Sequence, residues 1–151
     1  MDTLISFLIF CQALGAIAGA STAVWGEITY VHAMRNGEID SAERAHLLVI
    51  DKGLRFGMSL LLLSSLVLVV ISYVVHDEIQ PAMTTSYWIS ILFALLIIFI
   101  SWALARKNIS FALGSSAAFS AWWLLSIFAL GWLQVSFGTA IALFVVLTAV
   151  M

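Results

Sequence analysis

The chain has few charged residues and one cysteine, and each shortage excludes a class of protein. Charged residues make up 9% of its 151 residues, whereas a soluble domain carries about 25%. Because Cys11 is the only cysteine, a disulfide framework or a multi-cysteine metal site cannot form within one chain. The net charge of −2 comes without a basic block, so we expect no nucleic-acid partner.

Short catalytic motifs are also missing. No nucleophile elbow, phosphate loop, HExxH motif or dinucleotide fingerprint occurs in the sequence. The serines of the apolar segments have no histidine that could act as their base in a plausible packing. The sequence therefore favours a protein without catalytic chemistry of its own.

Long apolar runs fill most of the chain, and 64% of the residues are hydrophobic. Runs of about 20 apolar residues predict membrane-spanning helices. From Ile109 to Met151 no charged residue occurs, and as one helix this run would be roughly 65 Å long, twice the thickness of the hydrocarbon core. We expect it to fold back at GWLQVSFG, residues 131–138, where two glycines weaken the helix.

These runs predict an all-α, polytopic membrane helical bundle, with residues 1–151 forming a single integral membrane domain. Its five predicted spans cover about residues 4–26, 56–75, 87–104, 109–131 and 136–151. The last segment is short for a crossing, so four spans followed by a tilted or re-entrant segment is the alternative.

Basic residues in the connections predict the orientation of the bundle in a cell membrane, either an inner or a plasma membrane. The loop at 76–86 carries neither lysine nor arginine. We therefore expect the first and third connections to be cytoplasmic and the N-terminus to lie outside. The basic residues that support this prediction are Arg35, Arg44, Lys52 and Arg55 in the first connection and Arg106 and Lys107 in the third.

The first predicted span has one face of small and polar residues. At 100° per residue, Gln12, Glu27 and Tyr30 fall on this face, and the bulky residues fall on the other. Small residues let helix backbones approach closely in a bilayer. We therefore predict a helix-packing seam formed by Gly15, Ala16, Gly19, Ala23 and Gly26.

The seam does not account for Glu27, because an ionisable group near hydrocarbon needs a partner. Arg55 is the candidate, since two antiparallel helices would bring the inner ends of the first two spans to a similar depth. Asp51 lies one helical turn from Arg55 and would join the pair. The alternative is that both side chains merely extend to the interface.

Histidines and tryptophans are the remaining candidates for a binding site. We expect the three histidines to be solvated at the membrane interface and no metal to be bound; the alternative is a metal ion shared by His32 and His46, because His76 lies at the far end of the second span. Trp122 and Trp123 fall near the middle of the fourth span, where at least one should face the interior and pack against small residues. An aromatic pocket for a quinone-like or lipid-like ligand is the alternative to plain packing.

The stretch CQALGAIAGASTAVWG, with the later stretch SAERAHLLVIDKGLRFGMSLLLLSSLVLVV, resembles small bacterial membrane proteins of the copper-resistance-D type. The resemblance implies a bundle of four or five helices, and some members of that group are associated with copper or haem. Where those proteins would carry a histidine, this chain has Gln12.

Three functional hypotheses follow. The first is a small transporter or channel-like protein that uses a polar face formed by Gln12, Glu27 and Arg55. The second is a scaffold or accessory subunit of a membrane complex, or a homo-oligomer. The third is a redox membrane protein that binds haem or copper, although the first two require no cofactor.

Overall fold

The computed structural model describes residues 2–36, 41–75, 81–106 and 108–150, and these residues form helices and short connections. A short 3-10 helix, η1 (Pro81–Met83), precedes the third α-helix. The α-helices are α1 (Asp2–Asn36), α2 (Ser41–Val75), α3 (Thr85–Ala105), α4 (Phe111–Ala129) and α5 (Phe137–Val150). The predicted all-α bundle is confirmed.

Four helices are long and apolar enough to cross a bilayer, namely Thr3–Thr29, Val49–Val75, Thr85–Leu104 and Ala112–Ala129. The chain is therefore an integral membrane protein. Helix α5 has 14 residues and is about 21 Å long, which is less than the ~30 Å hydrocarbon core. Whether α5 crosses the bilayer stays a prediction.

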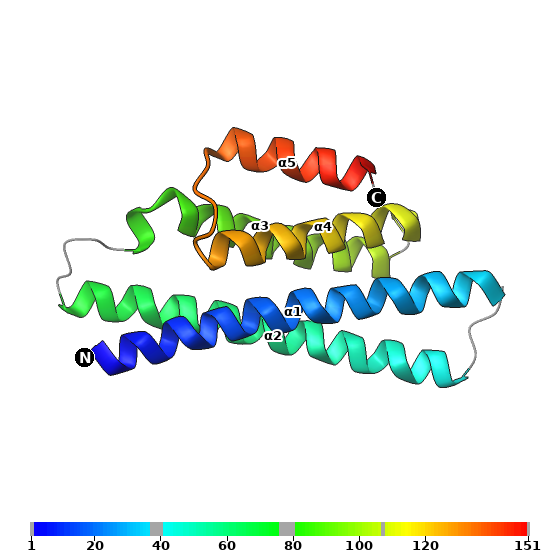
Figure 1. Cartoon of the computed structure of the whole chain (residues 1–151), viewed down its shortest axis with the longest axis horizontal. Coiled ribbons are helices and arrows are strands. Elements are labelled where there is room, and N and C mark those ends of the chain that lie inside the picture. Colours follow the sequence, from blue (N-terminus) through cyan, green and yellow to red (C-terminus); the bar gives the residue numbers. More distant parts are fainter. Residues whose placement is uncertain (1, 37–40, 76–80, 107, 151) are drawn as a thin grey trace.

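The helices form two antiparallel pairs joined through α1 and α4 (Figure 1). Helix α1 packs along α2 on one side and against α4 on another, while α3 packs along α4. Helix α5 lies outside this second pair, on α4 and α3. Two of the long helices, α1 and α2, extend beyond the α3–α4 pair at both ends of the bundle (Figure 1).

The break between the last two helices falls where the glycines predicted it. Gly131 has a positive φ of 69°, a conformation that glycine adopts without steric cost. Its amide donates to the Phe128 carbonyl at 3.1 Å, and the Trp132 amide donates to the Ile127 carbonyl at 3.1 Å. These two bonds form a Schellman motif, which satisfies carbonyls that the end of α4 would leave free.

The core lies where α1, α2, α3 and α4 meet. Phe93 of α3 contacts Phe128 of α4 and Phe144 of α5, with ring centroids 5.7 and 5.8 Å apart. These aromatic contacts attach α5 to the second helix pair. The largest fully buried side chains are Trp122, Phe93, Leu61, Ile89 and Leu125.

The uncharged part of α2, which begins at Phe56, and helix α4 are offset along the bundle. Gly19 of α1 faces Gly57 of α2. Because the two helices are antiparallel, the next residue along α1, Ala20, is level with the preceding residue of α2, Phe56. The Ser126 hydroxyl donates to the Ala16 carbonyl, so these two residues of α4 and α1 are level. Since α1 and α4 are also antiparallel, counting 15 residues back along α4 and 15 forward along α1 places Phe111 level with Val31. From Ala20 to Val31 is 11 residues, or about 16 Å of helix.

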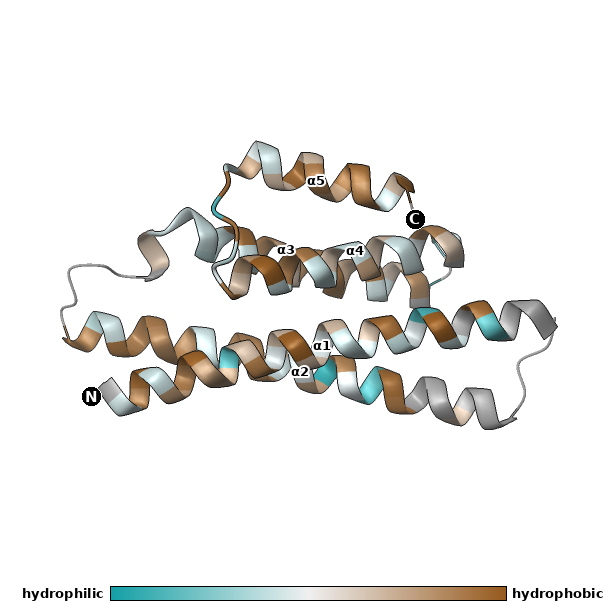
Figure 2. Ribbon diagram, in the orientation of Figure 1, coloured by the Kyte–Doolittle hydropathy of each residue, from teal (hydrophilic) through white to brown (hydrophobic). Residues whose placement is uncertain are grey.

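The part of α2 that follows its charged residues Asp51, Lys52 and Arg55 is therefore shifted toward the amino-terminal end of the bundle relative to α4. Hydrophilic residues of α2 appear at the level of the middle of α4 in Figure 2. We call this arrangement the offset of α2 and α4.

Candidate functional site

The predicted seam of small residues is the contact between α1 and α2. A Cβ atom on Gly15 would lie 2.8 Å from the Gly57 carbonyl oxygen and 2.8 Å from the Leu61 nitrogen. A Cβ atom on Gly57 would lie 2.8 Å from the Gly15 oxygen and 2.9 Å from the Gly19 nitrogen. The two backbones touch at this point, so the close approach predicted for Gly15 is confirmed.

The remaining seam residues vary in how they pack. Ala16 is fully buried, Ala23 packs against the core, and a Cβ atom on Gly26 would contact only the Ile50 side chain at 3.3 Å. The seam is therefore tightest near Gly15 and looser toward Gly26.

Trp122 and Trp123 have different environments, as two adjacent residues of a helix must. Trp122 is 2% exposed, and its ring fills the space where a side chain on Gly19 would lie, with its Cε3 atom 2.6 Å from the ideal Cβ position. Trp123 is 42% exposed. The prediction that one of them packs against small residues of another helix is confirmed for Trp122.

Two serines of α4 bond directly to α1. The Ser126 hydroxyl lies 3.0 Å from the Ala16 carbonyl oxygen of α1 and 2.8 Å from the Trp122 carbonyl oxygen of its own helix. The Ser115 hydroxyl donates to the carboxylate of Glu27. With Trp122 between them, these serines form a stripe of α4 that faces α1.

The expected pair of Glu27 with Arg55 is wrong. Arg55 bonds instead to Asp51 of its own helix, with Nη2 2.8 Å from Oδ2, and Glu27 accepts from Ser115. The prediction treated the ends of the two apolar segments as level. In the structure Arg55 is level with Ser21, six residues or about 9 Å from Glu27.

The predicted link of Asp51 with Arg55 is present, but it lies on the surface. The two side chains are 49% and 78% exposed. An exposed ion pair one helical turn apart contributes less than about 1 kcal/mol to stability.

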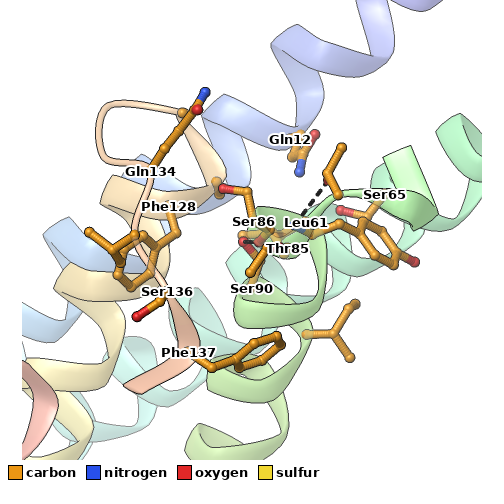
Figure 3. Close-up of a pocket in the computed structure, with 16 residues that line it drawn as sticks. Gln12, Leu61, Ser65, Thr85, Ser86, Ser90, Phe128, Gln134, Ser136 and Phe137 are labelled. Carbon is orange, nitrogen blue, oxygen red and sulfur yellow. Dashed lines mark hydrogen bonds between the residues drawn. The ribbon is translucent and has the colours of Figure 1, made fainter. Parts of the chain in front are cut away.

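Gln12 lines a cavity of about 810 Å³ near the amino-terminal end of the bundle, which we call the amino-terminal cavity. Figure 3 shows Gln12 of α1, Ser65 of α2, and Ser86 and Ser90 of α3 around this space. The segment between α4 and α5 closes another side with Gln134 and neighbouring residues. The cavity thus joins both helix pairs.

The chemistry of the amino-terminal cavity is polar but uncharged. Its walls carry two carboxamides, a phenol and several hydroxyls, and no lining residue is an acid or a base. Hydroxyl and carboxamide groups both donate and accept hydrogen bonds. The polar lining residues are Gln12, Ser65, Thr84, Thr85, Ser86, Tyr87, Ser90, Gln134 and Ser136.

The depth of the cavity follows from the position of Gln12. This residue lies nine positions from the start of the apolar segment Thr3–Thr29, or about 14 Å along it. A polar solute that reached Gln12 would therefore be within the apolar length of α1, at the level where the apolar segment of α4 ends.

Gln12 and Glu27 do not share one polar site. They are 15 residues apart, about 22 Å along α1. Buried side chains lie between their levels: Ala16 and Leu61 are 0% exposed, and Trp122 is 2% exposed. The polar face expected from the sequence is interrupted by the core.

His32, the one histidine whose side chain is described, fits a haem site poorly. His32 is exposed and lies beyond the end of the apolar segment Thr3–Thr29. Within the described residues, no three acidic, histidine or cysteine side chains could hold a metal ion together. A haem buried between spans takes axial ligands such as imidazole, but the position expected for it from the resemblance holds Gln12.

Some predicted residues fall outside the described side chains. These are Tyr30 of α1 and His46 of α2, whose side-chain positions are not described, and His76, which lies between the described ranges.

The residues that the sequence did not reveal are the hydroxyls. Ser115 and Ser126 were not among the predicted site residues, and neither were the serines and threonines of the amino-terminal cavity. A signal for the first two exists, because Ser115, Trp122 and Ser126 are spaced by seven and four residues and so share one helix face.

Comparisons of the chain with protein-family models, with curated proteins and with solved structures find no match.

Proposed function

We propose that this membrane protein is a small transporter that takes up an uncharged polar solute through the amino-terminal cavity. The observation that carries the proposal is the cavity of about 810 Å³ lined by carboxamides and hydroxyls within the apolar length of α1 and α2. Polar groups placed in a membrane bundle at this depth are expensive and commonly serve a solute pathway.

The absence of charge on the cavity walls defines the solute class. An ion would lack a counter-charge among the lining residues, whereas a small polyol or amide would exchange its bonds with water for bonds with hydroxyls and carboxamides. The volume is within the 300–1,000 Å³ range typical of small-molecule sites.

The direction of uptake follows from the predicted orientation. With the first and third connections in the cytoplasm, the N-terminus and the amino-terminal cavity face the outside. The packed layer around Trp122 and Leu61 separates the cavity from Glu27. The conformation is therefore the outward-facing one, and passage requires this layer to open.

A flux assay in liposomes tests the proposal. Proteoliposomes are mixed with glycerol or urea, and the rate of swelling is recorded by stopped-flow light scattering. We expect the wild type to exceed empty liposomes, and Gln12→Leu to lower the protein-dependent rate at least about fivefold, because a hydrogen-bonding group of the cavity is lost.

Gln12→Asn is the matched control, since it keeps the carboxamide and should retain more of the rate than Gln12→Leu. Wild-type vesicles that swell no faster than empty liposomes with either solute would contradict the proposal. Equal rates for Gln12→Leu and the wild type would remove Gln12 from the pathway.

A further inference from the structure

The carboxyl-terminal end of α3 carries three side chains that stack on its exposed face. The guanidinium carbon of Arg106 lies over the Trp102 ring, 4.4 Å from the ring centroid. The Trp102 ring also stacks with the ring of Phe99, with centroids 5.9 Å apart and ring planes 29° apart. The three residues are separated by three and four positions, so they share one helix face. We call them the arginine–tryptophan stack.

The stack extends from the hydrocarbon to the membrane surface. The apolar segment of α3 ends at Leu104, so Arg106 lies about 3 Å beyond this end and Phe99 about 8 Å within it. Trp102 and Phe99 are 46% and 60% exposed, and Arg106 is exposed as well. A lipid molecule beside this face of α3 therefore has its headgroup near Arg106 and its acyl chains near Phe99.

The cation of Arg106 is held in position but not neutralised. Within residues 2–36, 41–75, 81–106 and 108–150, no acid pairs with Arg106, and its side chain donates no hydrogen bond. Glu27 of α1, which reaches α4, bonds to Ser115 instead. Because Trp102 lies against the flat face of the guanidinium, the N–H groups in the guanidinium plane stay open to an acceptor.

The charges of the chain are divided unequally along the sequence. All 8 Asp and Glu residues precede position 79, whereas residues 79–151 contain Arg106, Lys107 and no acid. A zwitterionic headgroup would bring its ammonium group close to Arg106, with no carboxylate of α3, α4 or α5 to receive it. An anionic headgroup has no ammonium group and avoids this repulsion. The local charge therefore favours an anionic lipid over a zwitterionic one.

We propose that the arginine–tryptophan stack binds an anionic phospholipid such as phosphatidylglycerol. The lipid phosphate accepts hydrogen bonds from the Arg106 guanidinium, and one acyl chain lies along Trp102 and Phe99. The predicted orientation puts Arg106 at the cytoplasmic surface, whose leaflet carries the negative surface potential that anionic lipids create. This lipid site is independent of solute flux through the amino-terminal cavity.

Native mass spectrometry of the full chain, released from micelles of a mild detergent, tests the lipid site. Phosphatidylglycerol and phosphatidylcholine with the same acyl chains are added in equal amounts, and the complexes that hold one lipid are compared. We expect about fivefold more complex with phosphatidylglycerol, the ratio expected for one basic residue near a membrane surface. Inorganic phosphate in large excess should leave this ratio unchanged, because it has no acyl chain to pack against Trp102.

Three variants and one control locate the site. Arg106→Gln removes the cation and should lower the ratio to about one. Arg106→Lys keeps the charge but loses the flat group that stacks on Trp102, and should give an intermediate ratio. Trp102→Leu removes the ring that positions the guanidinium and should lower the ratio in part. Arg55→Gln changes the net charge as Arg106→Gln does, but it removes a cation that is already paired with Asp51, and should respond as the wild type does.

The expected result is a preference for phosphatidylglycerol that Arg106→Gln abolishes and Arg55→Gln retains. A wild type without this preference overturns the proposal, and so does an unchanged preference in Arg106→Gln. Equal losses from Arg106→Gln and Arg55→Gln overturn it as well, because net charge alone would then explain the preference. Displacement of the lipid by inorganic phosphate would also contradict a lipid site. A wild-type ratio in Trp102→Leu would contradict the role given to the ring.

Discussion

The two sides of α1 use glycine in opposite ways. Toward α2, Gly15 meets the backbone of α2 at Gly57, and no side chain lies between the helices at this crossing. Toward α4, Gly19 leaves a space that the large ring of Trp122 fills. Hydrogen bonds from Ser115 and Ser126 accompany the second contact, whereas the first consists of backbone contacts.

Because of this difference, we expect the two sides of α1 to respond differently to substitutions that add or remove atoms. The side facing α2 has no room for added atoms, because added atoms would meet backbone that can move only with its whole helix. The side facing α4 depends on atoms that are present, because removing them leaves a void inside a packed membrane bundle. Three substitutions separate these effects.

The largest effect is expected from Trp122→Ala. Removing this buried ring leaves a cavity against Gly19, and such truncations cost about 3–5 kcal/mol. The free energy of unfolding can be measured in mixed micelles of a mild detergent and SDS. Trp123→Ala, at the exposed neighbour, is the control and should cost much less. Similar losses from both variants would contradict the assignment of Trp122 to the interior.

A smaller effect is expected from Gly57→Ala. The added methyl group would be 2.8 Å from the Gly15 oxygen, so the helices must separate, at a cost of about 1–3 kcal/mol. Gly138→Ala makes the same change at the start of α5, where the nearest atom to a Cβ is the Ser136 hydroxyl at 4.0 Å. Its free energy of unfolding should be unchanged or higher. An equal loss at both glycines would argue against a close crossing of α1 and α2.

The smallest effect is expected from Ser126→Ala, which removes the hydrogen bond between α4 and the Ala16 carbonyl. Hydrogen bonds between membrane helices contribute about 0.6 kcal/mol on average. Unfolding in the same micelles measures the change, and Ser59→Ala on the exposed surface of α2 is the control. A loss above about 2 kcal/mol would show that the side facing α4 relies on polar bonds rather than on packing.

Local features of the fold could be read from the sequence. The break at Gly131 follows from glycines within an apolar run that is too long for one crossing. The close approach at Gly15 follows from small residues at helical spacing. Both depend on residues near one another in the chain, where the helix period alone fixes which side chains share a face.

The register between helices could not be read in this way. Arg55 was assigned to Glu27 because both residues end apolar segments, but α1 continues to Asn36 and α2 begins at Ser41. The helical turns that α1 and α2 add beyond their apolar segments determine which residues of the two helices lie side by side. The hydropathy pattern does not show these turns. The amino-terminal cavity could not be predicted for the same reason. Its hydroxyl groups come from different helices, and they lie close together only because of the register between those helices.

The offset of α2 and α4 has a consequence for the surrounding lipid. A bilayer that matched the uncharged part of α2 would end near the level of Ala20 on α1, whereas one that matched α4 would extend about 16 Å further. Helix α1 is apolar at both levels, from Thr3 to Thr29, so the mismatch concerns α2 alone. A bilayer that covered α4 would also cover the exposed pair of Asp51 and Arg55, so lipid headgroups and water must reach down to these charges beside α2, or the bundle must tilt.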